Sequence, residues 1–281
     1  MIDGRTTIIA HIGYPTESFK APMIYNPWFE KHAINAVVVP MGCRAEDYAV
    51  FFRPLFRLSN IAGALVTMPH KIPTLSLLDE VSVSAKVAGA CNAVRVDPGG
   101  RLVGDMFDGE GFVRSVVRKG RKLAGARVLV AGNGGVGSAI AASFAKAGAT
   151  VGIGEIALFD AHEPAMNALA GRIRASYPNL KVTVGSNDPA TFEIVVNATP
   201  LGMKAGDPLP MDVARISPSA LVGEVVMKEE ITPFLAAARA RGCEVQIGTD
   251  MLFEQIPAYL EFFGFGTATA DELRKIARIH Y

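Results

Sequence analysis

The sequence predicts an α/β protein made of two parts, and three observations lead to this prediction. Short apolar runs alternate with helical patterns along almost the whole chain, which is typical of βαβ units with parallel strands. The chain has 281 residues, 50% of them hydrophobic and 20% charged, so it can bury a large core and form two domains. A change of composition at Gly104–Phe112, which is rich in Gly and Asp, indicates a junction between the two parts.

Charge and cysteine content exclude several classes of function. The formal net charge is +1 and no stretch concentrates Lys and Arg, which excludes the usual footprint of a protein that binds nucleic acid or an anionic membrane. Cys43, Cys91 and Cys243 lie far apart without metal-ligand spacing, so we expect buried thiols in a reducing compartment and no metal. The N-terminus lacks the apolar run of a signal peptide, and no segment approaches the roughly 18 apolar residues of a membrane span. We therefore expect a cytoplasmic protein.

The first part is expected to contain four strands, each a short apolar run, with helical patterns between them. The expected strands are Thr7–Ile12, Ala36–Pro40, Gly63–Val66 and Ala93–Val96. The expected helices are Ala21–His32, Ala45–Leu58 and Thr74–Leu78.

The second part begins with an amphipathic helix at Gly111–Lys119, followed by the clearest unit in the chain. That unit is a strand at Val128–Ala131, an Ala-rich helix at Gly135–Ala147 and a strand at Glu155–Phe159. The later elements are expected to be strands at Lys181–Val184, Ile194–Asn197, Leu221–Val226 and Glu244–Ile247 and helices at Pro233–Arg241, Met251–Phe262 and Asp271–Ile279. We expect the last two helices to return to the first part.

A glycine-rich turn joins the first strand of the second part to its helix. It comprises Gly132, Asn133, Gly134, Gly135, Val136 and Gly137, in the pattern Gly-x-Gly-x-x-Gly. The first glycine permits a tight turn, the second lets the backbone approach a pyrophosphate, and the third lets the helix pack on the strand. The helix N-terminus offers N–H groups to the phosphates. A Rossmann dinucleotide-binding domain is predicted; the alternative is a glycine-rich turn without a ligand.

Asp160 ends the second strand of this domain and suggests which dinucleotide binds. A carboxylate there can accept hydrogen bonds from the ribose hydroxyls of NAD and repel the extra phosphate of NADP. Asp160 follows Gly132 by 28 residues, more than the usual spacing of about 20, and we expect the surplus in an extended loop at Thr150–Gly154. No Arg or Lys follows closely, so NAD is favoured over NADP. The alternative is that Asp160 merely begins a turn.

Lys71 and Asp108 are candidates for the chemistry of hydride transfer from an alcohol. Such a reaction needs a group that carries the hydroxyl proton and a carboxylate that fixes the geometry. Pro69 before Lys71, and Gly109 after Asp108, indicate that both candidates lie on tight connections at strand ends, where α/β proteins bind ligands. The alternative is that both are solvated surface groups.

Eight sequence blocks together resemble the shikimate/quinate dehydrogenase family. In order they are GYPTESFKAP, LVTMPHK, GACNA, GDMFDG, GNGGVG, NATPLGM, VMKEEITPFL and GTDMLFEQ. The resemblance spans nearly the whole chain and implies an oxidoreductase that acts on a ring hydroxyl of a cyclic polyol or hydroxy acid. It also implies a substrate domain over residues 1–108, a Rossmann domain over 109–247 and C-terminal helices over 248–281 that pack on the substrate domain.

The resemblance assigns roles to particular residues. It implies that Lys71 is the catalytic acid/base, that Asp108 pairs with it, and that Asn92 and Gln255 touch substrate hydroxyls. Thr67 matches a substrate-binding threonine. The segments that line the nicotinamide are matched by Asn197, Ala198 and Thr199 on one side and by Gly248 and Met251 on the other.

The chain departs from the family pattern mainly where the substrate carboxylate binds. The two serines that bind this carboxylate align with Phe19 and Ala21. Three further departures are Leu65 for an asparagine, Phe107 for a threonine and Met227 for a tyrosine. A buried carboxylate without donors costs several kcal/mol, so shikimate itself is a doubtful substrate.

Three hypotheses follow. The first is an NAD-dependent oxidoreductase, monomeric or homodimeric, that acts on a shikimate- or quinate-like small molecule. The second is a non-catalytic NAD-sensing protein, which the lost substrate contacts favour and the retained Lys71, Asp108, Asn92 and Gln255 oppose. The third is an aldehyde or acyl reductase with Cys43 or Cys91 as nucleophile, although neither has a His close in sequence.

Overall fold

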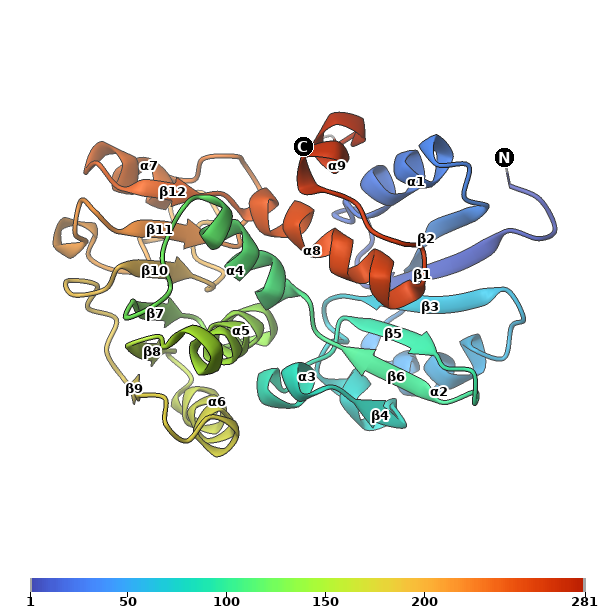
Figure 1. Ribbon diagram of the computed structural model, residues 1–281, viewed down its shortest axis with the longest axis horizontal. Helices are drawn as coiled ribbons and strands as arrows, with labels where there is room; N and C mark the ends of the chain where they lie inside the picture. The colour runs from blue at the N-terminus through green and yellow to red at the C-terminus, as the bar shows by residue number, and fades with distance from the viewer. Residues whose placement is uncertain (1, 280–281) are drawn as a thin grey trace. The chain divides into compact units, whose positions relative to one another are not determined.

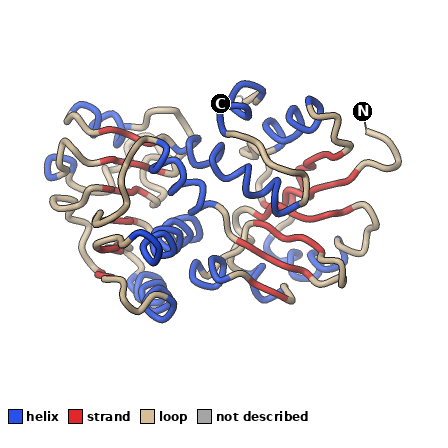
Figure 2. The backbone as a smooth tube through the Cα atoms, in the orientation of Figure 1, coloured by secondary structure: helices blue, strands red, loops and turns tan. Residues whose placement is uncertain are grey.

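The computed structural model describes residues 2–279, which divide into two compact units. Among these residues, unit 1 holds 2–85, 90–107 and 256–279, and unit 2 holds 86–89 and 108–255. Each unit has its own six-stranded sheet among the described residues, with the elements labelled in Figure 1 and the strands red in Figure 2. The predicted α/β class with two sheets is confirmed.

The sheet of unit 1 has the strand order β2-β1-β3-β5-β6-β4. Its strands are β1 (Thr7–Gly13), β2 (Ala36–Gly42), β3 (Ile61–Val66), β4 (Glu80–Val81), β5 (Ala93–Val96) and β6 (Leu102–Asp105). β1 is parallel to β2 and β3, but β5 is antiparallel to both β3 and β6. The expectation of parallel units throughout is therefore wrong here, because Asp97–Arg101 is too short a connection for a crossover and forms a hairpin turn closed by Asp97 N–Arg101 O at 3.0 Å.

One face of this sheet packs against the helix α2 (Ala45–Leu55). The helices with residues in unit 1 are α1 (Pro22–Lys31), α2, α3 (Val83–Ala88), α8 (Gly248–Phe263), which begins in unit 2, and α9 (Ala270–Ile276). Tyr48, Phe52 and Leu55 of α2 pack in one buried cluster with Ala10, Ile12, Ala64 and Val66 of the strands. The C-terminal helices return to this unit as expected, since Arg278 N donates to Met23 O at 2.9 Å.

The sheet of unit 2 is parallel, with the order β12-β11-β10-β7-β8-β9, as predicted for a Rossmann domain. Its strands are β7 (Arg127–Ala131), β8 (Glu155–Phe159), β9 (Val182–Val184), β10 (Ile194–Asn197), β11 (Leu221–Glu224) and β12 (Glu244–Gln246). Successive residues of the central strands are all buried, because both faces of a parallel sheet are covered. This explains why these strands read as continuous apolar runs.

The helices of unit 2 are α4 (Asp108–Arg118), α5 (Gly135–Val151), α6 (Glu163–Ser176), α7 (Pro233–Ala240) and the first half of α8. They differ from expectation most clearly in the length of α5 and in the presence of α6, which was not predicted. Thr150 and Val151, expected in an extended loop, are the last residues of α5, which ends at Gly152 with φ 77°. The surplus spacing to Asp160 is therefore partly helix, since the Ala-rich run continues until a residue can adopt the left-handed conformation.

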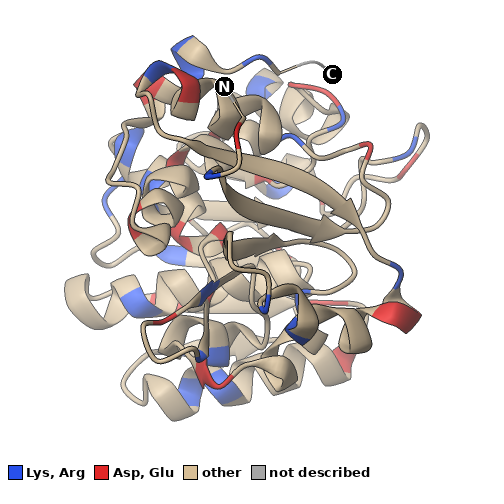
Figure 3. Cartoon of the chain, turned by 90° about the vertical axis from the view of Figure 1, so that its right-hand side faces the viewer, with Lys and Arg blue, Asp and Glu red and all other residues tan. Residues whose placement is uncertain are grey.

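Basic and acidic residues are nearly equal in number, with 28 Lys and Arg and 27 Asp and Glu. Figure 3 shows Lys and Arg interspersed with Asp and Glu along helices and loops, in keeping with a formal net charge of +1. Across residues 2–279, no helix combines the length and the apolar character needed to cross a bilayer.

Candidate active site

Lys71 lies in a turn between β3 and a short 3₁₀ helix, η1 (Pro73–Leu77), and its neighbours fix this turn. The buried ring of His70 stacks on Tyr48 with 3.9 Å between ring centroids, and its Nε2 donates to Cys43 O at 2.7 Å. Thr74 Oγ1 lies 2.6 Å from His70 O and 2.7 Å from Tyr48 Oη. The backbone that carries Lys71 is therefore held by buried hydrogen bonds on both sides, an anchoring that sequence reasoning missed.

Asn92 directly precedes β5, beside the Lys71 turn. Its side chain is 1% exposed, and its Oδ1 accepts a hydrogen bond from Phe107 N at 3.0 Å. Its carbonyl accepts from Val66 N at 2.8 Å, and Cys91 N donates to Lys71 O, also at 2.8 Å. Three segments distant in sequence are thereby tied together around Asn92 and Lys71.

Thr67 and Phe19 converge at the carboxyl ends of β3 and β1. A Cβ on Gly13 would lie 2.4 Å from Thr67 Cγ2 and 2.8 Å from Phe19 Cζ, so only glycine leaves room for both side chains. Phe19 stacks on His11 with 4.0 Å between ring centroids. Ala21, 7% exposed, precedes α1 and makes no side-chain capping hydrogen bond. Neither Phe19 nor Ala21 offers a side-chain donor at this end of the sheet.

His11 is a polar member of this group that sequence reasoning missed. The ring is 8% exposed, and its Nδ1 is buried without a hydrogen-bond partner in the described part of the chain. Burial and, to a smaller extent, the positive charge of Lys71 lower the pKa of His11 to about 3. A histidine within the otherwise apolar run of β1 was the signal available in the sequence.

The glycine turn of unit 2 has the conformation that its spacing predicts. Gly132 follows β7 with φ 90°, and its Cβ would lie 2.5 Å from the carbonyl carbon of Ala198. A Cβ on Gly137 would lie 1.8 Å from Gly132 O, so the helix can pack this closely only without a side chain. A Cβ on Gly134 would meet no atom within 4 Å. The backbone at Gly134 is thus open to a ligand, while the other two glycines are packing requirements.

Asp160 lies directly against this turn. Its Oδ2 accepts a hydrogen bond from Asn133 N, and its Oδ1 accepts one from His162 N at 2.8 Å. Gly135 and Val136, both half-buried, form the first turn of α5. The carboxylate, the turn and the helix N-terminus therefore form one cluster, which is the arrangement that a dinucleotide's ribose and pyrophosphate require.

Asn197 organises the end of β10. Its Oδ1 accepts hydrogen bonds from Thr199 N at 3.0 Å and Thr199 Oγ1 at 2.6 Å. Its Nδ2 donates to Leu201 O at 3.1 Å and to Glu224 Oε2 at 3.2 Å. Glu224 is fully buried, and burial raises the pKa of its carboxyl. Asn197 therefore shapes the loop that carries Ala198 and Thr199 instead of presenting its side chain to solvent.

Comparison with known proteins decides the family. Residues 11–94 match the model described as the shikimate dehydrogenase substrate binding domain. The chain is 32% identical over 274 residues to the shikimate dehydrogenase (NADP(+)) of Acidiphilium cryptum, which covers 97% of this chain and 96% of that protein. The chain belongs to the shikimate dehydrogenase family. The resemblance inferred from the eight sequence blocks is confirmed.

Solved structures of this family share the whole fold. A shikimate 5-dehydrogenase from Listeria monocytogenes in complex with shikimate and NAD is 25% identical, with a TM-score of 0.87, covering 98% of this chain and 97% of that chain. A quinate dehydrogenase from Corynebacterium glutamicum in complex with NAD is 29% identical, with a TM-score of 0.84, covering 96% and 98%. The matched domain architecture supports the fold derived from the sequence.

Asp108 and Gln255, assigned by the family resemblance, belong to unit 2. Asp108 was expected on a tight connection, but it is the first residue of α4. Gly109 serves helix packing instead, since its Cβ would lie 1.9 Å from Ala139 O. A Cβ on Gly111 would lie 2.5 Å from Met251 O and 2.7 Å from Gln255 Cβ. Two glycines therefore let α4 approach both α5 and α8 closely.

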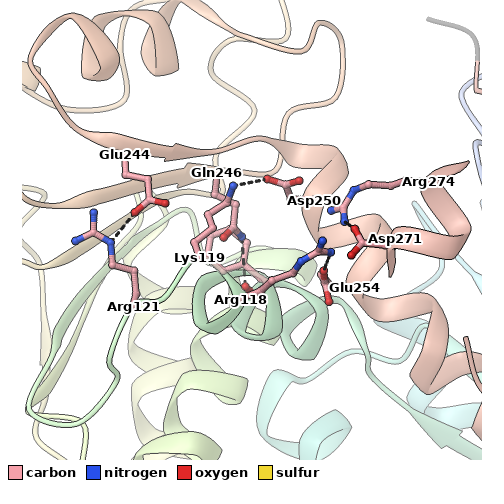
Figure 4. Close-up of polar contacts among 10 residues, drawn as sticks. Arg118, Lys119, Arg121, Glu244, Gln246, Asp250, Glu254, Asp271 and Arg274 are labelled. Atoms are coloured by element: carbon pink, nitrogen blue, oxygen red, sulfur yellow. Dashed lines mark hydrogen bonds and ion pairs between the residues drawn. The ribbon is translucent and has the colours of Figure 1, made fainter. Parts of the chain in front are cut away.

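Ion pairs fix α8 against α4, as Figure 4 shows. Arg118 Nη1 lies 2.7 Å from Glu254 Oε1, and Lys119 Nζ lies 3.1 Å from Asp250 Oδ2. At the start of α8, a Cβ on Gly248 would lie 2.4 Å from Val226 O. Met251 and Gln255 are therefore held on a fixed helix within unit 2.

The structure gathers the candidates into two groups, one in each unit. Unit 1 holds the substrate candidates Phe19, Ala21, Thr67, Lys71 and Asn92. Unit 2 holds the glycine turn, Asp160, Asn197–Thr199, Gly248, Met251, Gln255 and Asp108. Thr67 and Lys71 are half-buried, whereas Asn92 and Asp108 are buried.

The cysteine hypothesis loses support in this family member. Cys91 is fully buried, and burial raises the pKa of its thiol to about 12. Burial and the negative charges of Asp47 and Glu46 raise the pKa of the Cys43 thiol. Because the thiolate is the nucleophile, neither cysteine is suited to attack an aldehyde or acyl group.

Proposed function

We propose that the chain is an NAD-dependent oxidoreductase that oxidises or reduces one ring position of a shikimate- or quinate-like cyclic polyol. The observation that carries the proposal is the rigid turn of Lys71 beside Asn92 and Thr67 in a member of the shikimate dehydrogenase family. The relatives named above act on shikimate or quinate by their names. Lys71 and Asn92 both lie in the segment that matches the family's substrate-binding domain.

In this proposal Lys71 carries the proton of the reacting hydroxyl. During oxidation the amine takes the hydroxyl proton while a hydride leaves the same carbon, and reduction reverses both transfers. NAD, when bound, accepts or donates the hydride. Asp108 orients the hydroxyl, and Asn92, Thr67 and Gln255 bind the remaining hydroxyls. The glycine turn fits the dinucleotide because the backbone at Gly134 is unobstructed.

Asp160 supports NAD as the preferred dinucleotide. Its carboxylate lies at the glycine turn, where an adenosine ribose phosphate would meet a negative charge. The residues from Ala161 to Gly171 contain no Lys or Arg that could hold that phosphate. The curated relative named above is NADP-dependent by its name, so cofactor choice is a property of this chain's own residues.

Phe19 and Ala21 support a substrate that differs from shikimate at the end where shikimate carries its carboxylate. A hydroxyl donating to a carboxylate contributes about 1.5–3 kcal/mol, so two missing donors weaken binding by about 10²–10⁴-fold. Phe19 adds bulk and stacks on His11. We propose that shikimate and quinate are poor substrates and that a less polar or larger group is preferred at this end.

Steady-state kinetics test both parts of the proposal. Shikimate, quinate and their methyl esters would each be assayed with NAD and NADP by the absorbance of the reduced dinucleotide. We expect turnover with NAD and a higher kcat/KM for an ester than for its acid. The double variant Phe19→Ser with Ala21→Ser should raise kcat/KM for shikimate. A shikimate KM of about 1 μM–1 mM with turnover near about 10 s⁻¹ would contradict the altered carboxylate end. Tight NAD binding without turnover of any polyol would favour the NAD-sensing alternative.

A further inference from the structure

His11 occupies a position in the sheet that faces the substrate candidates. It pairs in parallel register with Leu65 of β3, so the two side chains lie on the same face of the sheet. Its neighbours Ala10 and Ile12 point to the opposite face, where they join the core beneath α2. Thr67, two residues after Leu65, continues the same face as His11. The imidazole is therefore not part of the apolar core of α2.

The ring has no partner for one of its two nitrogens. Nδ1 is buried and makes no hydrogen bond within the described residues. Buried polar groups in folded proteins are nearly always paired, so an orphaned ring nitrogen requires an explanation. A strand position whose neighbours are apolar gives no structural reason for histidine, since valine or isoleucine would fill it without an unpaired group.

The surroundings give the ring a defined chemical character. Phe19 covers one face of the imidazole at 4.0 Å between centroids. Burial, and to a smaller extent the positive charge of Lys71, keep the pKa of His11 at about 3. At neutral pH the ring is therefore uncharged, with one donor and one acceptor nitrogen.

We propose that His11 is a specificity-determining residue that hydrogen-bonds an uncharged oxygen of the substrate beside Lys71. The inference rests on the proposed function and names the class of substrate more narrowly. A neutral imidazole supplies no charge to a carboxylate, and neither Phe19 nor Ala21 supplies a side-chain donor. An ester, a hydroxyl or a ketone oxygen suits this site, because each can pair with a neutral ring. The site therefore favours a neutral cyclic polyol or its ester over the free acid.

Substitution of His11 tests this role. His11→Val removes the ring nitrogens, His11→Asn keeps a donor and an acceptor, and Ile9→Val is a matched control on the same strand and face. With NAD and methyl shikimate, we expect His11→Val to lower kcat/KM at least tenfold, mainly through KM. His11→Asn should recover part of this loss, and Ile9→Val should leave kcat/KM unchanged.

Thermal unfolding separates a binding role from a structural one. Since Nδ1 makes no hydrogen bond within residues 2–279, His11→Val should not lower the melting temperature, whereas Ile9→Val should lower it slightly. A large drop in melting temperature for His11→Val, with kcat/KM recovered on cooling, would show that the ring is structural. That outcome overturns the inference.

The remaining outcomes distinguish this inference from the proposed function. If the wild-type protein turns over methyl shikimate and Lys71→Met abolishes it, but His11→Val keeps kcat/KM within twofold, only the role of His11 is overturned. If no turnover occurs, the proposed oxidoreductase fails, and calorimetric binding of methyl shikimate in the presence of NAD then tests His11. Equal affinity in wild type and His11→Val, or no binding by either, overturns the inference.

Discussion

The carboxyl ends of the two sheets present their polar groups in different ways. In unit 2, both oxygens of Asp160 and both side-chain ends of Asn197 are bonded within the unit, three of these bonds being to backbone N–H groups. In unit 1, a buried nitrogen of His11 makes no hydrogen bond within the described residues, and Phe19, which stacks on its ring, has no side-chain donor. This difference implies that a binding site made largely of backbone groups depends on the conformation of its turn. A binding site made of side chains can change with each single substitution.

The largest expected effect is a loss of turnover on substitution of Lys71 in unit 1, with no change in cofactor binding by unit 2. Lys71→Met should lower turnover about 10²–10⁴-fold, the usual range for a general acid or base. NAD affinity should not change, because the dinucleotide candidates lie in unit 2. Lys275→Met, at an exposed position of α9, is the matched control and should be silent. Near-normal turnover of Lys71→Met on a confirmed substrate would remove Lys71 from the mechanism.

The second prediction concerns the free energy of unfolding at low pH and follows from the pKa of His11. The ring is neutral in the folded state down to a pKa of about 3, whereas the unfolded chain binds the proton near 6.5. Between these values the unfolded state holds more protons, so the free energy of unfolding falls as pH falls. From pH 7 to pH 4 this contribution is roughly 3 kcal/mol.

Urea unfolding of wild type and His11→Val at pH 7 and pH 4 measures this contribution. The variant should lose less stability on acidification than the wild type. Equal losses would mean that His11 is protonated in the folded protein or exposed to water.

The third prediction concerns the preference of unit 2 for NAD over NADP. Asp160→Asn should reduce the preference for NAD over NADP by about 10–100-fold, because the variant no longer places a negative charge near the ribose phosphate. Glu163→Gln removes an exposed carboxylate three residues later and should leave the ratio unchanged. Dissociation constants for both dinucleotides, measured by calorimetry, check the ratio. Tighter binding of NADP by the wild type would contradict the role of Asp160.

The smallest expected effect separates two kinds of glycine in unit 2. Gly134→Ala should change the free energy of unfolding by less than about 0.5 kcal/mol, because its methyl group meets no atom, yet weaken NAD binding about tenfold. Gly171→Ala, an exposed position within α6, should raise the free energy of unfolding by up to about 1 kcal/mol without affecting NAD. Urea unfolding and NAD titration of both variants test this contrast. Unchanged NAD affinity in Gly134→Ala would mean that the backbone there does not meet the dinucleotide.

The sequence predicts the parallel sheet of unit 2 well for two reasons. Both faces of its central strands are apolar, and the glycine turn marks the connection from a strand to a helix. The prediction fails where the local pattern is weak or where contacts with residues distant in sequence determine the structure. α6 was overlooked although Met166, Leu169, Ala170 and Ile173 have helical spacing. β6 was overlooked because only Leu102 and Val103 of its four residues are large and apolar, and it is recognised by its pairing with β5. His11 was overlooked although a histidine stands out in the apolar run of β1, because that run does not show which residue the ring contacts, and the structure places Phe19 against it.

The discontinuity of unit 1 in sequence also affects the order in which the chain can fold during synthesis. Unit 2 is nearly one uninterrupted stretch, 108–255, and all of it has been synthesised before residues 256–281 are added. Unit 1 needs that last stretch: a Cβ on Gly63 of β3 would lie 2.5 Å from Phe263 Cε1, and Lys31 of α1 pairs with Glu272 at 2.8 Å. The N-terminal residues therefore appear first but complete their unit last. Until then, part of the β3 face and of α1 is uncovered, a period in which a nascent chain is open to aggregation or chaperone capture.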